Sequence, residues 1–323
     1  MVLTSAARTA LEEAGPIWEQ LGNQAMLAEN RANRSVERLH AGDLKACLAF
    51  SQESNELSKH IKNDWGQVNS RVFVSLAYWA RGEIDTALEV LKATIPIARR
   101  VGHPGETLNL VQLSWIYESL GAEGPAFQAA REATEVSGDF PPSYVYALNM
   151  LARLYLHAGD LAKTGEFFQQ AAETGHTRTI LAINLLIDLV DSEYQLARGE
   201  TERAAGMLEE LLKLISESGA RFFLPEVLSF KAGLLDRGDR VQEAYETLQT
   251  ALRVAEEIGL RMEAWRIHAR LSALARRLEN IPAAEGHHSL ALQTLEQISE
   301  QISDPDLVKS FKSLATPLIN ITS

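Results

Sequence analysis

Residues 39–50 read LHAGDLKACLAF, and close variants return as WARGEIDTALEV at 79–90, LHAGDLAKTGEF at 156–167 and LARGETERAAGM at 196–207. The glycine of this phrase marks a unit of 38 to 40 residues, at Gly42, Gly82, Gly121, Gly159, Gly199 and Gly238, with Glu279-Asn280 in the same place in a seventh unit. An acidic residue follows most of these glycines. This order is typical of one helix that ends at glycine and a second that starts with a carboxylate.

Small side chains keep a fixed distance from each marker. Seven residues before it stand Ser35, Ser75, Ser114, Ala152, Ser192 and Ser272, and five residues after it stand Cys47, Ala87, Ala126, Thr164, Ala204 and Ala284. Two antiparallel helices need small residues where their axes come closest. The sixth unit departs from the pattern with Lys231 and Glu243, and the nearby Gly233 and Ala244 indicate a local shift of register.

A second glycine series closes the other helix of each pair, at Gly22, Gly102, Gly138, Gly175, Gly219 and Gly259, with Asn63-Asp64 filling the one gap. Between the two series the apolar residues recur at helical spacing, and no stretch alternates as a strand would. Each helix pair buries its remaining apolar face only by stacking on the next pair. The sequence therefore predicts an all-α solenoid of about seven helix-turn-helix repeats.

The pattern of a small residue, an aromatic residue or leucine, Gly-Asp/Glu and a later alanine resembles the tetratricopeptide repeat, most plainly in SLAYWARGEIDTALEVL and MLARLYLHAGDLAKTGEFF. The unit is longer than the standard one of about 34 residues. It is more similar to the C-terminal repeat domains of bacterial signalling ATPases of the maltose-regulator type and of nucleotide cyclases. The resemblance implies an α-α superhelix whose first helices line the inner surface, and a role in protein interaction, signalling or transcription regulation.

The expected organisation is an N-terminal helix over 1–22, a solenoid over 23–303 with repeats of 38–41 residues, and a capping helix with a tail over 304–323. The first segment fits a half repeat of a longer protein as well as it fits a natural cap. In the last segment Asp304 can cap a helix whose apolar face carries Leu307, Phe311 and Leu314.

Composition limits the partners. The chain has 31 Lys and Arg against 43 Asp and Glu, a formal charge of −12 that opposes direct contact with nucleic acid. Its uncharged stretches are shorter than a membrane span needs. The single cysteine, Cys47, fits a reducing compartment and a packing role. We expect a cytoplasmic protein.

No strong catalytic or cofactor motif is present, since the phosphate-binding loop, the dinucleotide glycine pattern, GxSxG and HExxH are all missing from the sequence. His287 and His288 are adjacent on a helix and point about 100° apart, so they are expected to be exposed and incidental. Asp188 and Asp191 are expected to be a solvated helix face. We therefore expect no enzyme, no cofactor and no metal site.

Binding residues are expected on the inner face of the first helices. The groove candidates are Trp79, Trp115, Tyr146, Asn149 and Arg153. The inner face is apolar over three repeats, and this stripe of Ala32, Val36, Val72, Leu76, Val111 and Trp115 can be either core or binding surface. Arg266, Arg270 and Arg277 form a possible basic strip for an acidic partner. The predicted function is non-enzymatic binding of a protein segment, and the alternative is a sensory domain that holds a small-molecule inducer or signalling peptide.

Overall fold

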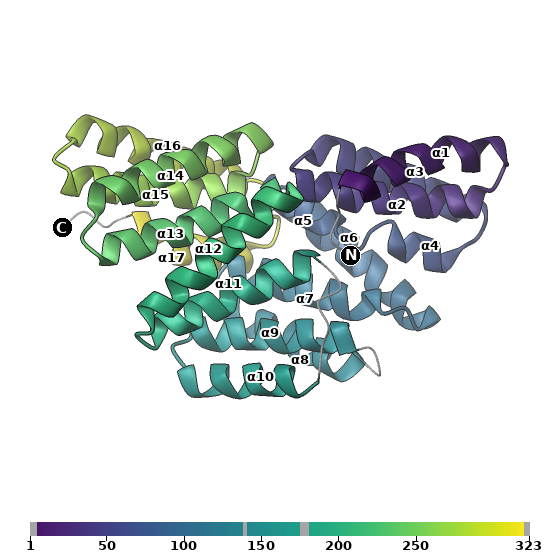
Figure 1. Cartoon of the computed structure of the whole chain (residues 1–323), viewed down its shortest axis with the longest axis horizontal. Coiled ribbons are helices and arrows are strands. Elements are labelled where there is room, and N and C mark those ends of the chain that lie inside the picture. The colour runs from purple at the N-terminus through teal and green to yellow at the C-terminus, as the bar shows by residue number, and fades with distance from the viewer. Residues whose placement is uncertain (1–4, 138–140, 175–180, 320–323) are drawn as a thin grey trace. The chain divides into compact units, whose positions relative to one another are not determined.

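The computed structural model describes residues 5–137, 141–174 and 181–319, and every regular element in these ranges is helical (Figure 1). Gly138 and Gly175 of the second glycine series, and the ends of the expected terminal segments at 1–4 and 320–323, lie outside the described residues. The prediction of an all-α fold is confirmed. None of the described helices is long and apolar enough to cross a membrane.

The helices follow one another as the two glycine series predict. After α1 (Ser5–Gln20), seven pairs are formed by α2 (Gln24–Ala41) with α3 (Leu44–His60), α4 (Asp64–Asn69) and α5 (Val74–Ala80) with α6 (Ile84–Val101), α7 (Gly105–Ser119) with α8 (Glu123–Val136), α9 (Pro141–His157) with α10 (Leu161–Glu173), α11 (Leu181–Ala197) with α12 (Thr201–Ser218), α13 (Leu224–Arg237) with α14 (Val241–Ile258), and α15 (Arg261–Arg277) with α16 (Ile281–Ser299). A short 3-10 helix, η1 (Arg221–Phe223), precedes α13, and α17 (Pro305–Ile319) ends the described chain.

The chain divides into two compact units. Unit 1 comprises Met1–Ala77, Thr86–Glu118 and Glu123–Val190, and unit 2 comprises Tyr78–Asp85, Ser119–Ala122 and Asp191–Ser323. This division differs from the predicted boundaries at 22 and 303, which remain a prediction for the domain organisation. Each unit has its own buried apolar residues.

Small residues hold the two helices of a pair together, and serine does so with a hydrogen bond. The Ser35 hydroxyl donates to the Cys47 carbonyl, Ser114 to Ala126 and Ser272 to Ala284, each at 2.8 Å. The hydroxyl thus reaches the neighbouring backbone directly, which larger side chains would prevent. Cys47 is buried in this contact, and burial raises the pKa of its thiol to about 11. Its predicted packing role agrees with this environment.

The first helix of the second pair is broken into α4 and α5. The break frees backbone carbonyls, which need new partners when they are buried. The Ser51 hydroxyl of α3 donates to the Ser70 carbonyl at 2.6 Å, and Gln112 of α7 donates to the Val72 carbonyl at 2.9 Å. Side chains of both neighbouring pairs therefore stabilise the interruption.

The turn of the sixth pair is displaced by one residue. Gly238 has a φ of −84°, and Asp239 takes the left-handed conformation with a φ of 56°. Counted from Asp239, the small positions fall on Ala232 and Ala244, and both side chains are fully buried. The expected register shift is therefore present and amounts to one residue.

The closing helix α17 packs against α15 and α16 in unit 2. Asp304 caps it by accepting a hydrogen bond from the Asp306 backbone amide at 2.9 Å. Phe311 is fully buried, and its ring meets Trp265 of α15 edge to face with centroids 5.7 Å apart. The amphipathic pattern predicted a capping helix at this place, and α17 has that position.

Candidate functional site

Three of the predicted groove residues form one column on α9. Tyr146, Asn149 and Arg153 follow at spacings of three and four, which places them on one face of the helix. In unit 1 this face lies beside α7, which carries Trp115, and beside the first half of α11. Residues of three successive first helices therefore meet here.

These helices enclose a small cavity, which we call the α9 cavity. Its volume is about 10 Å³. It is lined by Trp115, Tyr146, Asn149, Met150, Arg153, Leu186 and Val190. Four of the five predicted groove residues thus line one cavity, and the walls between their polar groups are apolar.

Two polar atoms at the α9 cavity have no hydrogen-bond partner in the described part of the chain. They are the hydroxyl of Tyr146 and the Nδ2 amide nitrogen of Asn149. The two side chains are 3% and 4% exposed. Buried polar groups are nearly always paired in native proteins, so two such atoms on one wall are unusual. Burial also raises the pKa of Tyr146, which keeps its hydroxyl protonated.

A charged network borders the cavity on the side of α7. Glu118 accepts from the Arg153 Nε at 2.8 Å and pairs with the His157 Nδ1 at 2.6 Å. Burial raises the pKa of Glu118, but the charge of Arg153 and the hydrogen bond from His157 outweigh burial and lower that pKa to about 2. The Arg153 guanidinium also lies 5.5 Å from the centre of the Trp115 ring. Arg153 is therefore held between a carboxylate and an aromatic face.

Sequence reasoning missed several of these residues. Three of the five groove candidates stand six or ten residues before their marker glycine, whereas Glu118 and His157, which were not among the candidates, stand three and two before theirs. Those positions face the same side of a helix as the position six before, so helical periodicity could have found them. Leu186 and Val190 gave no signal, because apolar residues at helical spacing are ordinary core residues.

The other predicted binding residues have partners within the chain. Trp79 is 3% exposed and donates its indole N–H to the Ser119 hydroxyl at 2.8 Å, and it does not line the α9 cavity. In the inner apolar stripe Ala32, Val72, Leu76 and Val111 are also buried, and Val36 is half-buried. This part of the inner face is therefore core.

The three arginines of the predicted basic strip are engaged as well. Arg266 donates to the Ser119 carbonyl at 3.2 Å, Arg270 donates to the Ser229 carbonyl at 2.7 Å, and Arg277 pairs with Asp236. Burial lowers the pKa of Arg270. Contact of this strip with an acidic partner stays a prediction, and it would compete with these internal bonds.

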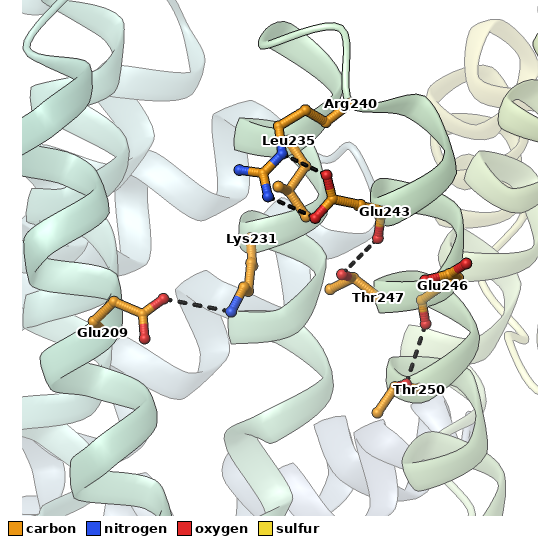
Figure 2. Close-up of a pocket in the computed structure, with 8 residues that line it drawn as sticks. All are labelled: Glu209, Lys231, Leu235, Arg240, Glu243, Glu246, Thr247 and Thr250. Atoms are coloured by element: carbon orange, nitrogen blue, oxygen red, sulfur yellow. Dashed lines mark hydrogen bonds and ion pairs between the residues drawn. The ribbon is translucent and has the colours of Figure 1, made fainter.

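A larger cavity of about 450 Å³ lies between α12, α13 and α14 in unit 2, and Figure 2 shows eight residues that line it. Two ion pairs lie on its walls: Lys231 of α13 contacts Glu209 of α12 at 3.4 Å, and Arg240 contacts Glu243 at the start of α14 through two bonds of 2.5 and 2.6 Å. Lys231 and Glu243 are the residues that broke the small-residue pattern. The one-residue shift of the turn places them on this wall instead of between the helices.

These ion pairs are exposed, and ion pairs at the protein surface contribute little to stability. The Thr247 and Thr250 hydroxyls donate to carbonyls of their own helix at 2.7 and 3.1 Å. The wall is thus polar but its groups satisfy one another. It gives weaker evidence of a ligand than the two unpaired donors of the α9 cavity.

The histidine and aspartate pairs singled out in the sequence do not form a metal site in the described ranges, where no group of three or more potential ligands converges. The expectation of an exposed, incidental pair was wrong for His287, because its Nδ1 lies 3.0 Å from that of the buried His268. Asp191 accepts from Gln195 at 2.7 Å and is half-buried rather than fully solvated.

No protein-family model matches the sequence, and no curated protein matches it significantly. A Rap protein complexed with Competence and Sporulation Factor is similar in structure, with a TM-score of 0.62 and 11% sequence identity over 86% of this chain and 77% of the Rap chain. A Signal Transduction ATPase with Numerous Domains from Pyrococcus horikoshii, which has a tetratricopeptide repeat sensor, aligns with a TM-score of 0.58 and 11% identity. That alignment covers 93% of this chain and 47% of the ATPase, so this chain spans about half its length.

Identity this low shows the fold alone. The class that the helices and these structures define is a tetratricopeptide-repeat-like helical solenoid, and the prediction of this class is confirmed.

Proposed function

We propose that the chain is a non-enzymatic regulatory module that binds a protein segment at the α9 cavity. The observation that carries this proposal is the cavity itself, where three first helices bring an aromatic wall, apolar side chains and unpaired polar groups together. Binding sites commonly combine an apolar lining with a few placed polar groups. Buried aromatic and arginine residues, here Trp115 and Arg153, are also frequent anchors of protein interfaces.

The two structural neighbours favour the same role. One is a Rap protein in complex with Competence and Sporulation Factor, and the other is a signal-transduction ATPase with a tetratricopeptide repeat sensor. We propose by analogy that this chain belongs to a bacterial cytoplasmic protein of signalling or transcription regulation. The net charge of −12 disfavours direct binding of nucleic acid.

The test begins with selection of binding segments from a displayed library of random peptides on the wild-type protein. The affinity of each selected peptide is then measured by fluorescence anisotropy for Asn149→Leu, which alters the cavity wall, and for Lys213→Ala. Lys213 is a matched control because its side chain is 75% exposed on α12 and lines neither cavity. We expect Asn149→Leu to weaken binding at least about ten-fold, equivalent to about 1.4 kcal/mol, and Lys213→Ala to leave it unchanged.

Failure to select any segment, or equal affinity for wild type and Asn149→Leu, would contradict the proposal.

The second candidate function is a sensor for a small-molecule inducer, which the buried position of Tyr146 and Asn149 favours. A thermal-shift screen against metabolites tests it, because a ligand that binds only the folded state raises the melting temperature.

A further inference from the structure

The two unpaired donors of the α9 cavity restrict the chemistry of its ligand. The Tyr146 hydroxyl and the Asn149 Nδ2 each have a proton to donate, and they are three residues apart on the same helix face. Leaving such groups unpaired and buried is unfavourable. One oxygen with two lone pairs can accept from both.

The size of the cavity agrees with a single oxygen. A volume of about 10 Å³ is close to that of one water-sized sphere, so the space beside the two donors suits a single oxygen atom. The remainder of a ligand has to lie along the apolar walls, which include Leu186 and Val190 of α11. A ligand that takes this place instead of a water molecule therefore has to present an oxygen attached to an apolar body.

The charges beside the cavity decide between a neutral and an anionic oxygen. The only guanidinium among the residues that line it belongs to Arg153, and Glu118 already accepts its Nε–H at 2.8 Å. Glu118 itself is held by His157, so its negative charge stays next to the cavity. The charges of Arg153 and Glu118 compensate each other, so a carboxylate buried here would add an anion for which the residues that line the cavity offer no further cation.

Using the same site as the proposed function, we infer that the α9 cavity recognises a neutral carbonyl oxygen, such as that of an amide, and discriminates against a carboxylate. The oxygen accepts from Tyr146 and Asn149, and the attached apolar group packs on Trp115, Leu186 and Val190. The same chemistry is available in a peptide bond and in a small acyl compound. The cavity therefore recognises the carbonyl group, and the surrounding face determines which molecule carries that group.

Three small probes with the same branched hydrocarbon chain test this inference: 4-methyl-2-pentanone, isovalerate and isoamylammonium. Their binding to the full chain is followed by nuclear magnetic resonance, as saturable shifts of the side-chain amide of Asn149 and the indole N–H of Trp115. We expect the ketone to bind with millimolar affinity, as suits so few atoms, and the two charged probes to bind at least about ten-fold more weakly. The double variant Tyr146→Phe with Asn149→Leu should lose most of the ketone affinity.

The free protein supplies a second readout. Since the Tyr146 hydroxyl has no partner in the described chain, Tyr146→Phe should leave the melting temperature unchanged or raise it. Tyr144→Phe is the matched control on the same helix, at a half-buried position that does not line the cavity. A fall in melting temperature of several degrees for Tyr146→Phe alone would show that the hydroxyl is satisfied without a ligand and would overturn the inference.

Equal or tighter binding of isovalerate would also overturn it, as would ketone binding that the double variant leaves intact. These outcomes are separate from the test of the proposed function. If displayed peptides bind through Asn149 but isovalerate outcompetes the ketone, only the carbonyl inference fails. If the ketone binds as expected and no peptide is selected, only the protein-segment function fails.

Discussion

Replacing Phe311 with alanine tests whether α17 closes the array. Phe311 is fully buried and meets Trp265 of α15 edge to face at 5.7 Å. The substitution removes the largest apolar group that α17 inserts against the seventh pair. A terminal pair of a solenoid has no later pair to cover its apolar face, so its stability depends on such a cap.

The magnitude follows from the burial of the ring. Truncating a buried phenylalanine to alanine costs about 3–5 kcal/mol, and an edge-to-face aromatic pair accounts for about 0.5–1.5 kcal/mol of such an effect. For 323 residues, an unfolding entropy of about 2.1 cal/mol/K per residue gives about 0.7 kcal/mol/K in total. We therefore expect the melting temperature to fall by about 4–7 °C.

The assay is urea and thermal unfolding followed by far-ultraviolet circular dichroism, with size-exclusion chromatography to detect association. Leu318→Ala is the matched control, because Leu318 lies on the same helix and is 38% exposed. Its effect should be within about 0.5 kcal/mol, as for other surface substitutions. The Phe311 variant should also associate, since it exposes apolar surface of α15 and α16.

A Phe311→Ala protein that stays monomeric and keeps the melting temperature of the control would refute the capping role. A separate early transition of small amplitude would have a different meaning. It would show that α17 and the last pair unfold independently of the other repeats, as repeat arrays do when their cooperativity is limited.

Three further predictions concern turns and acid stability. Asp239→Gly should stabilise the protein by about 1 kcal/mol, because glycine adopts the left-handed φ of 56° without the steric penalty, and a lower urea midpoint would contradict this. Gly121→Ala should lower the free energy of unfolding more than Gly159→Ala. Both glycines have a positive φ, but only a Cβ at position 121 would lie 3.0 Å from a backbone oxygen of α17. Equal losses of stability in the two variants would rule out that contact. Burial lowers the pKa of His40, His103 and His268 to about 4. Below the ordinary pKa of 6.5 the unfolded chain binds protons at these histidines that the folded chain does not, so the free energy of unfolding should fall progressively between pH 6.5 and 4. Urea midpoints that stay constant from pH 7 to 5 would contradict this prediction.

The local conformations of this chain were largely readable from its sequence. Gly42 and Gly199 take a positive φ that other residues rarely adopt, and each follows the end of a helix. Carboxylates such as Asp43 and Asp160 accept from backbone amides three residues later and start the next helix. These effects act within a few residues, so a repeated phrase determined helix pairs, turns and the solenoid class.

Only the tertiary structure decided which inward residues bind and which are core. Arg153 meets Glu118 across 35 positions of sequence, and the α9 cavity needs side chains from three helices. The one-residue shift at Asp239 likewise moved Lys231 out of the helix contact and into a cavity wall. Such pairings depend on how successive pairs stack, and the helical periodicity that predicts each pair is the same for a core residue and for a binding residue.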